Sequence, residues 1–392
     1  MRHRRRESER LIETEMDTTA SPDAPLVTPA MRRQIVFWLI TLSVIVLLLY
    51  IFRSILLPFV AGMALAYLLD PVADRLERMG ASRVVATTII LLVFVVTFVV
   101  ALLALAPVLS NQLNGFIERL PSYISRLQSL IASSDNPIVE RLVGEGSQNI
   151  RENLDEVLQQ GAGWLATLAG SIWSGGKALV DVLSLLVITP IVAFYLLLDW
   201  DRMVATIDGW LPRDHKTTIE DIGRDIDGVV AGFVRGQGSV CLILGTFYAV
   251  ALSLVGLNFG LLIGIFAGLI SFIPFVGSLI GLLLAGGVAL VQFWPDFLWI
   301  GMVVAIFAFG QFVEGNVLQP KLVGGSVGLH PVWLMFALSA FGVLLGFTGL
   351  LIAVPVAAAI GVLVRFALSR YLASPFYRGD TPVAGPSVGM PE

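Results

Sequence analysis

Polar side chains gather at one place within the otherwise apolar second half of the chain. They are Gln311, Glu314, Asn316, Gln319 and Lys321. A charged side chain near the middle of a bilayer costs about 2.5–3.5 kcal/mol on insertion scales, so a carboxylate at that depth requires an explanation. Glu314 could bind a cation, exchange a proton or hold a polar solute, with the neighbouring amides as helpers. It could instead lie at the membrane interface and pair with Lys321.

The residues that follow this group predict a change in the backbone. Pro320, Gly324, Gly325 and Gly328 indicate that the helix carrying Glu314 has ended by then. An unwound backbone would leave carbonyl groups free to coordinate a cation or a polar solute, as in the broken helices of transporters.

A second break in an apolar run lies at residues 272–277. Pro274 removes a backbone donor and disfavours helix at the residue before it. Carbonyl groups freed at membrane depth need water, protein or a ligand as partner. Pro274 and Gly277 are therefore candidate residues of a substrate or ion site. A tight turn between two spans is an equally good interpretation.

Glycines with a four-residue spacing precede this break. They are Gly256, Gly260, Gly264 and Gly268. Residues 277, 281 and 285 continue the spacing with two further glycines and an alanine. Small faces of this kind let helix backbones approach closely inside a bilayer. The pattern favours simple helix packing, and a smooth sliding surface for a moving element is the alternative.

Residues that carry other chemistry are sparse. Cys241 is the only cysteine, and the three histidines are far apart in the sequence. Residues 173–178 look like a phosphate loop, but Ser171 stands where a Walker A motif needs glycine and Ala178 where it needs Ser or Thr. We therefore predict no enzyme, no metal site and no cofactor. A net charge of −4 gives no general signal for nucleic-acid binding.

The composition sets the class of protein. The chain is 56% hydrophobic and 14% charged, whereas soluble domains carry about 25% charged residues. Ten apolar runs follow a polar start, at residues 35–51, 55–69, 84–108, 178–198, 240–257, 259–273, 275–293, 297–313, 332–346 and 349–366. We predict an all-α polytopic membrane protein with about seven or eight transmembrane helices, since a span of the hydrocarbon core takes about 20 residues.

Several of these runs are too short for a straight span. They could be re-entrant hairpins, thin spans or halves of broken helices, and we predict short or broken re-entrant hairpins in the C-terminal half. We expect residues 259–273 and 275–293 to form one hairpin, broken at Pro274. We expect residues 332–346 and 349–366 to form a second, broken at their glycine-rich join. Both hairpins are predicted to belong to one substrate-facing unit.

Basic residues predict the orientation. If the N-terminus is cytoplasmic and every run crosses, 19 of the 25 Lys and Arg residues lie on the cytoplasmic side. We therefore predict a multi-pass protein of a prokaryotic inner membrane with both termini in the cytoplasm. Its predicted segments are a disordered tail (1–33), transmembrane helices (34–109), an extracytoplasmic amphipathic segment (110–177), a transmembrane helix (178–198), a cytoplasmic helical segment (199–237), a transport core (238–370) and a disordered tail (371–392).

Both predicted segments outside the bilayer carry helical stripes. Apolar residues recur at three- and four-residue steps over 113–131 and again over 150–158, and Pro121 fits a break between helices. A similar stripe covers 219–233. Ordinary helix packing is the favoured interpretation, and a membrane-surface or gating role is the alternative.

An ordered series of short motifs resembles the autoinducer-2 exporter family of membrane permeases. The motifs lie at residues 58–59, 66–67, 70–71, 75–77, 194–199, 274–277, 314–321, 328–331 and 346–355. Each is weak alone, but together they cover about residues 50–370 in the family's order. The resemblance implies a multi-span permease, with export of a quorum-sensing signal in some members and sodium/proton exchange in others.

These observations predict a secondary transporter or facilitator that moves a small polar molecule, such as autoinducer-2, out across the cytoplasmic membrane. A sodium/proton antiporter is the nearest alternative. A membrane scaffold that binds a partner through its soluble helices is an alternative of another class. The expected partners are the lipid bilayer and a small polar solute or monovalent cation, and a second copy of the chain is a candidate partner.

Overall fold

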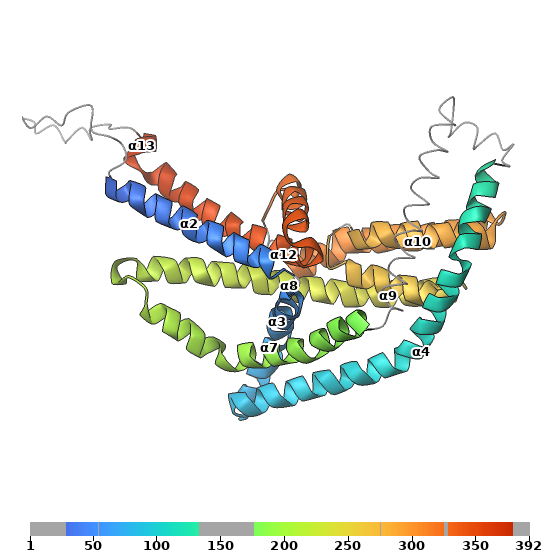
Figure 1. Cartoon of the computed structure of the whole chain (residues 1–392), viewed down its shortest axis with the longest axis horizontal. Helices are drawn as coiled ribbons and strands as arrows, with labels where there is room; N and C mark the ends of the chain where they lie inside the picture. Colours follow the sequence, from blue (N-terminus) through green and yellow to red (C-terminus); the bar gives the residue numbers. More distant parts are fainter. Residues whose placement is uncertain (1–28, 54, 133–175, 275, 325–327, 379–392) are drawn as a thin grey trace, which may run out of the picture. The chain divides into compact units, whose positions relative to one another are not determined.

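The computed structural model describes residues 29–53, 55–132, 176–274, 276–324 and 328–378, and every regular element in these ranges is helical. The helices are α2 (Pro29–Ile51), α3 (Leu56–Arg78), α4 (Arg83–Ala132), α7 (Gly176–Gly209), η2 (Arg213–His215), α8 (Lys216–Leu254), α9 (Gly260–Ile270), α10 (Val276–Phe293), α11 (Phe297–Val313), η3 (Glu314–Val323), α12 (Pro331–Ala373) and α13 (Pro375–Arg378) (Figure 1). The predicted stripe over 150–158 and most of both tails lie outside the described residues.

Seven of the described helical stretches are long and apolar enough to cross a membrane. They lie in α3, α4, α7, α8, α10, α11 with η3, and α12. Such helices satisfy their own backbone hydrogen bonds, which hydrocarbon cannot do for them. The all-α polytopic class predicted from composition is confirmed. The N-terminal unit, which contains α2, is a separate compact body from the unit that begins at Arg53.

Helices α3, α4 and α7 form the first packed group of the larger unit. Gly62 of α3 lies so close to Val192 and the Thr189 carbonyl of α7 that a Cβ would be 2.7 Å and 2.9 Å from their atoms. Around this contact, five residues of the three helices form a small buried core, namely Leu65, Ala66, Leu91, Ala193 and Leu197.

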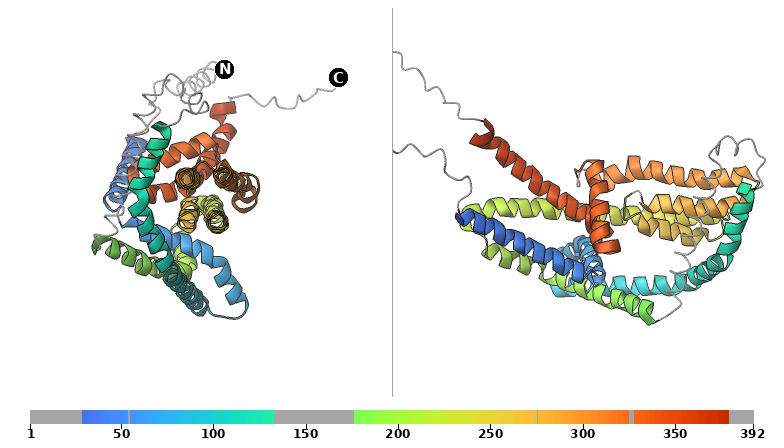
Figure 2. Two further views of the ribbon diagram at one scale, coloured as in Figure 1. Left: turned by 90° about the vertical axis from the view of Figure 1, so that its right-hand side faces the viewer. Right: turned by 45° about the horizontal axis from the view of Figure 1, so that its top comes forward.

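Helix α8 is the centre of the second group, and α9 packs on it through glycine. A Cβ on Gly264 would collide with the Ala249 backbone, and one on Gly268 would collide with Gly245. Gly260 fits against Leu252 in the same way. Figure 2 shows α8, α9 and α10 running alongside one another. Close backbone approach of this kind is the packing that small residues permit in membranes.

Gly256 does not belong to that packing face. It lies in the turn between α8 and α9 with φ +74°, and no atom outside its immediate surroundings lies within 4 Å of where its Cβ would be. A left-handed residue after a helix is most easily a glycine, because other residues carry a Cβ penalty there. The four-residue spacing therefore combined one turn glycine with three packing glycines.

The two predicted breaks occur. Helix α9 is only 11 residues long, and residues 271–273 turn the chain into α10, which packs against α9. The chain of α12 is kinked at Gly346 (φ 63°, ψ −139°). Beyond the kink it folds back, so that Gly349 lies against the Phe341 carbonyl and Gly342 lies near Leu350. Both hairpins pack on α8.

The predicted break at Pro121 is wrong. Helix α4 runs without interruption from Arg83 to Ala132 and includes both Pro107 and Pro121. Figure 1 shows that this long helix is bent rather than broken. A proline inside a helix removes one hydrogen bond and kinks it, but packing can hold the two parts together. Here Phe116 and Tyr123 pack on Phe259, which holds this part of α4 against the start of α9.

Candidate functional site

Glu314 begins a stretch of π-helix that continues α11 without a break. Residues Glu314–Val323 form this wider turn, and it ends at Gly324, where φ is +60°. The prediction that the helix has ended by Pro320 is therefore wrong, since Pro320 lies inside η3. In a π-helix each backbone hydrogen bond spans one residue more than in an α-helix, which widens the turn, and such segments are frequent at functional sites. Pro320 supplies no N–H to its hydrogen-bond ladder.

The Glu314 side chain is buried among neutral groups. The residue is 6% exposed, and Gln311 Nε2 donates to its Oε2 at 2.7 Å. No ion pair joins Glu314 to Lys321 in the part of the chain that the structure describes, and Lys321 is exposed. The alternative of an interfacial Glu314–Lys321 pair is therefore not the arrangement present. A buried carboxylate without a cationic partner is costly, and it is rarely retained without a role.

Gln237 of α8 connects the π-helix to the tip of the α9–α10 hairpin. Its side chain is fully buried, its Nε2 donates to the Ser271 carbonyl, and its Oε1 accepts from Gln319 Nε2 at 3.4 Å. Sequence reasoning missed Gln237, because a single amide in an amphipathic helix resembles a surface residue. The available signal was its setting between Gly236 and Gly238, at the point where α8 turns apolar.

Glycines let these three elements meet. A Cβ on Gly236 would collide with the Leu322 carbonyl of η3. A Cβ on Gly277, at the start of α10, would collide with the Ser271 backbone nitrogen and its hydroxyl group. Since a side chain at either position would force the backbones apart, the glycines set the distance across which Gln237 bonds.

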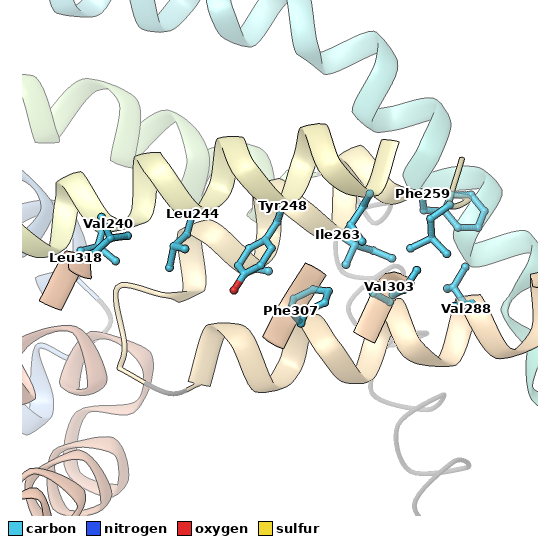
Figure 3. Close-up of a cluster of buried hydrophobic side chains, with 14 of the residues drawn as sticks. Val240, Leu244, Tyr248, Phe259, Ile263, Val288, Val303, Phe307 and Leu318 are labelled. Carbon is cyan, nitrogen blue, oxygen red and sulfur yellow. The ribbon is translucent and has the colours of Figure 1, made fainter. Parts of the chain in front are cut away.

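Tyr248 places a second unusual polar group near this site. It lies about three helical turns beyond Gln237 in α8 and stacks on Phe307 of α11, with ring centroids 4.6 Å apart (Figure 3). Its hydroxyl is buried against Gly310 and close to the Gln311 side chain, but no hydrogen bond of good geometry reaches it within the described residues. A buried hydroxyl without a partner costs about 1–3 kcal/mol, so this group is available to a ligand or water.

The other predicted residues fall into different surroundings. Pro274 and Gly277 are buried at the hairpin tip, next to the Ser271 that Gln237 contacts. Gln319 is half-buried and bonds Gln237, whereas Gln311 is exposed beside Glu314. Asn316 is exposed, and its amide donates at 2.9 Å to the Phe312 carbonyl of its own helix. The structure thus brings together Gln311, Glu314, Gln319, Pro274 and Gly277, and it leaves Asn316 outside.

A second polar group, which we name the Arg83–Arg235 network, lies where α3, α4, α7 and α8 meet. Arg83 donates to Asp70, Asp74 and Glu77 at 2.9–3.0 Å and to the Leu197 carbonyl at 2.8 Å. The other members extend it to α8. Arg235 bonds Asp70 at 3.1 Å and the Tyr67 carbonyl at 2.7 Å, and Tyr67 donates to Asp227 at 2.8 Å. Several family-like motif residues of the first half lie in this network.

The family is shown by comparison with known proteins. The model of the AI-2E family transporters matches residues 39–369. This chain belongs to the AI-2E transporter family. It is 28% identical over 345 residues to YrrI of Bacillus subtilis, which is named as a candidate transport protein, with 84% of this chain and 95% of YrrI covered.

Two further relatives come from Escherichia coli K12. PerM, named as a candidate permease, is 27% identical over 336 residues, with 81% of this chain and 89% of PerM covered. TqsA, named as an AI-2 transport protein, is 23% identical over 317 residues, with 81% of this chain and 86% of TqsA covered. The resemblance drawn from the motifs is confirmed, and the chain is a multi-pass membrane protein of a transporter family.

Proposed function

We propose that this protein is a secondary transporter whose polar solute or coupling cation binds at Glu314. The observation that carries the proposal is a buried carboxylate that meets amides and no cation in the described structure. Gln311 and Gln319 supply amide groups at the carboxylate, and Gln237 extends this set by bonding Gln319. Such a set can replace the water around a small hydroxylated solute or a monovalent cation, because each of its groups offers hydrogen bonds or oxygen ligands.

The position of the site between three elements supports a transport role. The hairpin tip, α8 and the π-helix each contribute one side, and two of these elements are broken or widened helices. Transporters commonly build their sites from such interrupted helices near the membrane midplane. Glu314 itself is only 6% exposed, and Gln237 is fully buried. We infer that the arrangement is an occluded one, with Gln311 on its exposed side.

We propose that the protein exports a small polar molecule. Autoinducer-2 is the example we propose, because the relative TqsA is named as an AI-2 transport protein. We propose an inner-membrane location with both termini in the cytoplasm, on the basis of the basic-residue distribution. A cysteine at position 118, in α4, tests this orientation in a Cys241→Ser background. It should react with an impermeant reagent in intact cells, and a reaction confined to lysed cells contradicts the orientation.

The function is tested with purified protein in liposomes and a panel of solutes and ions. Glu314→Gln preserves shape and removes the charge, so transport should fall at least about tenfold while thermal stability stays at or above that of the wild type. Glu118→Gln makes the same chemical change at an exposed residue of α4 and should transport normally. Full transport by Glu314→Gln would remove this residue from the mechanism.

The panel also separates the alternatives. Uptake of a solute that depends on Glu314 supports the solute transporter. Exchange of sodium for protons without solute movement supports the antiporter instead. If no compound or ion on the panel moves, the membrane-scaffold alternative becomes the better interpretation. We propose no catalytic activity, in line with the transporter and permease names of the relatives.

A further inference from the structure

A separate cavity lies between the first half of α8 and the last turns of α12. Its volume is about 560 Å³, which is within the range of roughly 300–1,000 Å³ typical of small-molecule sites. Five residues from each helix line it: Thr218, Asp221, Ile222, Asp225 and Val229 from α8, and Val362, Arg365, Phe366, Ser369 and Arg370 from α12. We call it the α8–α12 cleft. It shares no residue with the Glu314 site.

The two walls carry opposite charges that do not pair across the cleft. Asp221 bonds Arg224 of its own helix at 2.9 Å, and the Arg370 guanidinium lies 5.3 Å from the ring centre of Phe366, also on its own helix. Asp225 and Arg365 have no ion pair within the described ranges. Two carboxylates thus face two guanidinium groups across an open space. A ligand that complements both walls must carry an anionic and a cationic group.

The cleft also changes in polarity along its length. The end of α12 and the start of α8 run in opposite directions (Figure 1), so Thr218 and Ser369 belong to the polar end of the cleft and Val229 and Val362 to its apolar end. No charged residue precedes Arg365 in α12, from Pro331 onward. The cleft therefore lies where an apolar membrane helix first becomes charged. This is the depth of lipid headgroups, where basic side chains often contact phosphate.

We propose that the α8–α12 cleft binds a phosphate–ammonium zwitterion, with phosphate on Arg365 and Arg370 and a primary ammonium on Asp221 and Asp225. Guanidinium groups suit phosphate because their fork of donors matches its oxygens. Carboxylates suit a primary ammonium, which brings three donors. This chemistry is shared by the headgroup of phosphatidylethanolamine and by free phosphoethanolamine. The polarity gradient favours the lipid, whose acyl chains would leave at the apolar end.

Lipid retention by the purified full-length protein tests the proposal. Native mass spectrometry is performed with equal amounts of phosphatidylethanolamine, phosphatidylglycerol and phosphatidylcholine. The glycerol headgroup lacks the cation, and the choline headgroup lacks ammonium donors. Phosphatidylethanolamine should be retained about fivefold over each of the others, since exposed charge pairs are worth up to about 1 kcal/mol. Equal retention of the three lipids by the wild-type protein would exclude the lipid headgroup as the occupant of the cleft.

Matched variants separate the two walls. Asp225→Asn should abolish the preference for phosphatidylethanolamine over phosphatidylglycerol, and Arg365→Gln should weaken retention of all three lipids. Asp214→Asn and Arg213→Gln make the same charge changes just before α8, outside the cleft, and should leave retention unchanged. Equal losses in the control variants would show a general charge effect and contradict the site.

The soluble source is tested in parallel. Free phosphoethanolamine at millimolar concentration is added to delipidated protein, and thermal unfolding is measured. A shift that Asp225→Asn removes, without a lipid preference, assigns the cleft to the soluble compound. A lipid preference without such a shift assigns it to the membrane. Absence of both contradicts the proposal, and neither result depends on Glu314, so the outcome is independent of the proposed transport function.

Discussion

The Arg83–Arg235 network and the Glu314 site both place charged groups among apolar helices, and they satisfy those charges in different ways. Arg83 meets three carboxylates and a carbonyl, and its side chain is 19% exposed. Glu314 is buried more deeply and has amides in place of a cation. Removing one charge from a matched group leaves its partners uncompensated and lowers stability, whereas an unmatched buried charge itself costs stability. We therefore interpret the Arg83–Arg235 network as a structural clamp and the Glu314 group as a candidate functional site.

The two groups also differ in the elements that they join. The network links α3, α4 and α7 to α8, while the Glu314 site links α8 to the hairpin tip and the π-helix. Three consecutive residues of α8 are divided between the network and the Glu314 site. Arg235 bonds α3, Gly236 lies against η3, and Gln237 bonds Ser271. A substitution at Arg235 in the network therefore changes the residue of α8 that is next to those forming the Glu314 site.

The largest expected effect is on stability, from Arg83→Gln. This change leaves three carboxylates together without their cation, which should cost about 2 kcal/mol, less than the 3–5 kcal/mol of a fully buried pair. The measurement is unfolding of the purified protein in detergent. Arg213→Gln, at an exposed position, is the matched control. A loss no greater than that of the control would show that the network is not a clamp.

The next effect is on transport, from Gln237→Leu. The change removes the amide that joins the hairpin tip to Gln319, so transport per folded protein should fall about tenfold, with about 1–2 kcal/mol lost in stability because the Ser271 carbonyl loses its side-chain donor. Gln292→Leu removes a glutamine with comparable bonds, to Asn258 and Gly256. It should cost similar stability and keep transport. Equal transport in both variants would place Gln237 outside the mechanism.

A smaller effect is expected between Arg235 and Asp70. Their side chains are 40% and 34% exposed, so water and salt screen the pair. A double-mutant cycle with Arg235→Gln and Asp70→Asn should give a coupling free energy of about 0.5 kcal/mol, which declines as salt is added. A coupling that persists in high salt would indicate that the network excludes water more completely than these exposures imply.

The smallest effect is expected from Asn316→Ala. Its amide bonds the Phe312 carbonyl of the same helix and faces outward, so stability should change by less than about 0.5 kcal/mol. Transport should remain near wild type, in contrast to Glu314→Gln. A large transport loss would extend the site to the outer face of the π-helix and weaken the contrast between buried and exposed polar groups.

The sequence by itself determined the class, the helices and the family. Long apolar runs allow only membrane helices, since hydrocarbon cannot satisfy an open backbone. Proline and glycine marked the hairpin tip at Pro274 and the kink at Gly346, because these residues restrict or free the backbone locally. Glu314 could also be recognised from its sequence neighbours alone, because it is a single carboxylate in an apolar stretch.

Only the tertiary structure decided which residues meet. Gln237 and Ser271 are 34 positions apart, and Gln237 and Gln319 are 82 apart, so no local pattern could pair them. It also decided that Pro121 bends a helix held by its neighbours, that Pro320 lies within a π-helix, and that Gly256 turns the chain. In each case a local preference of about a few kcal/mol or less competes with packing, and packing depends on residues distant in the sequence.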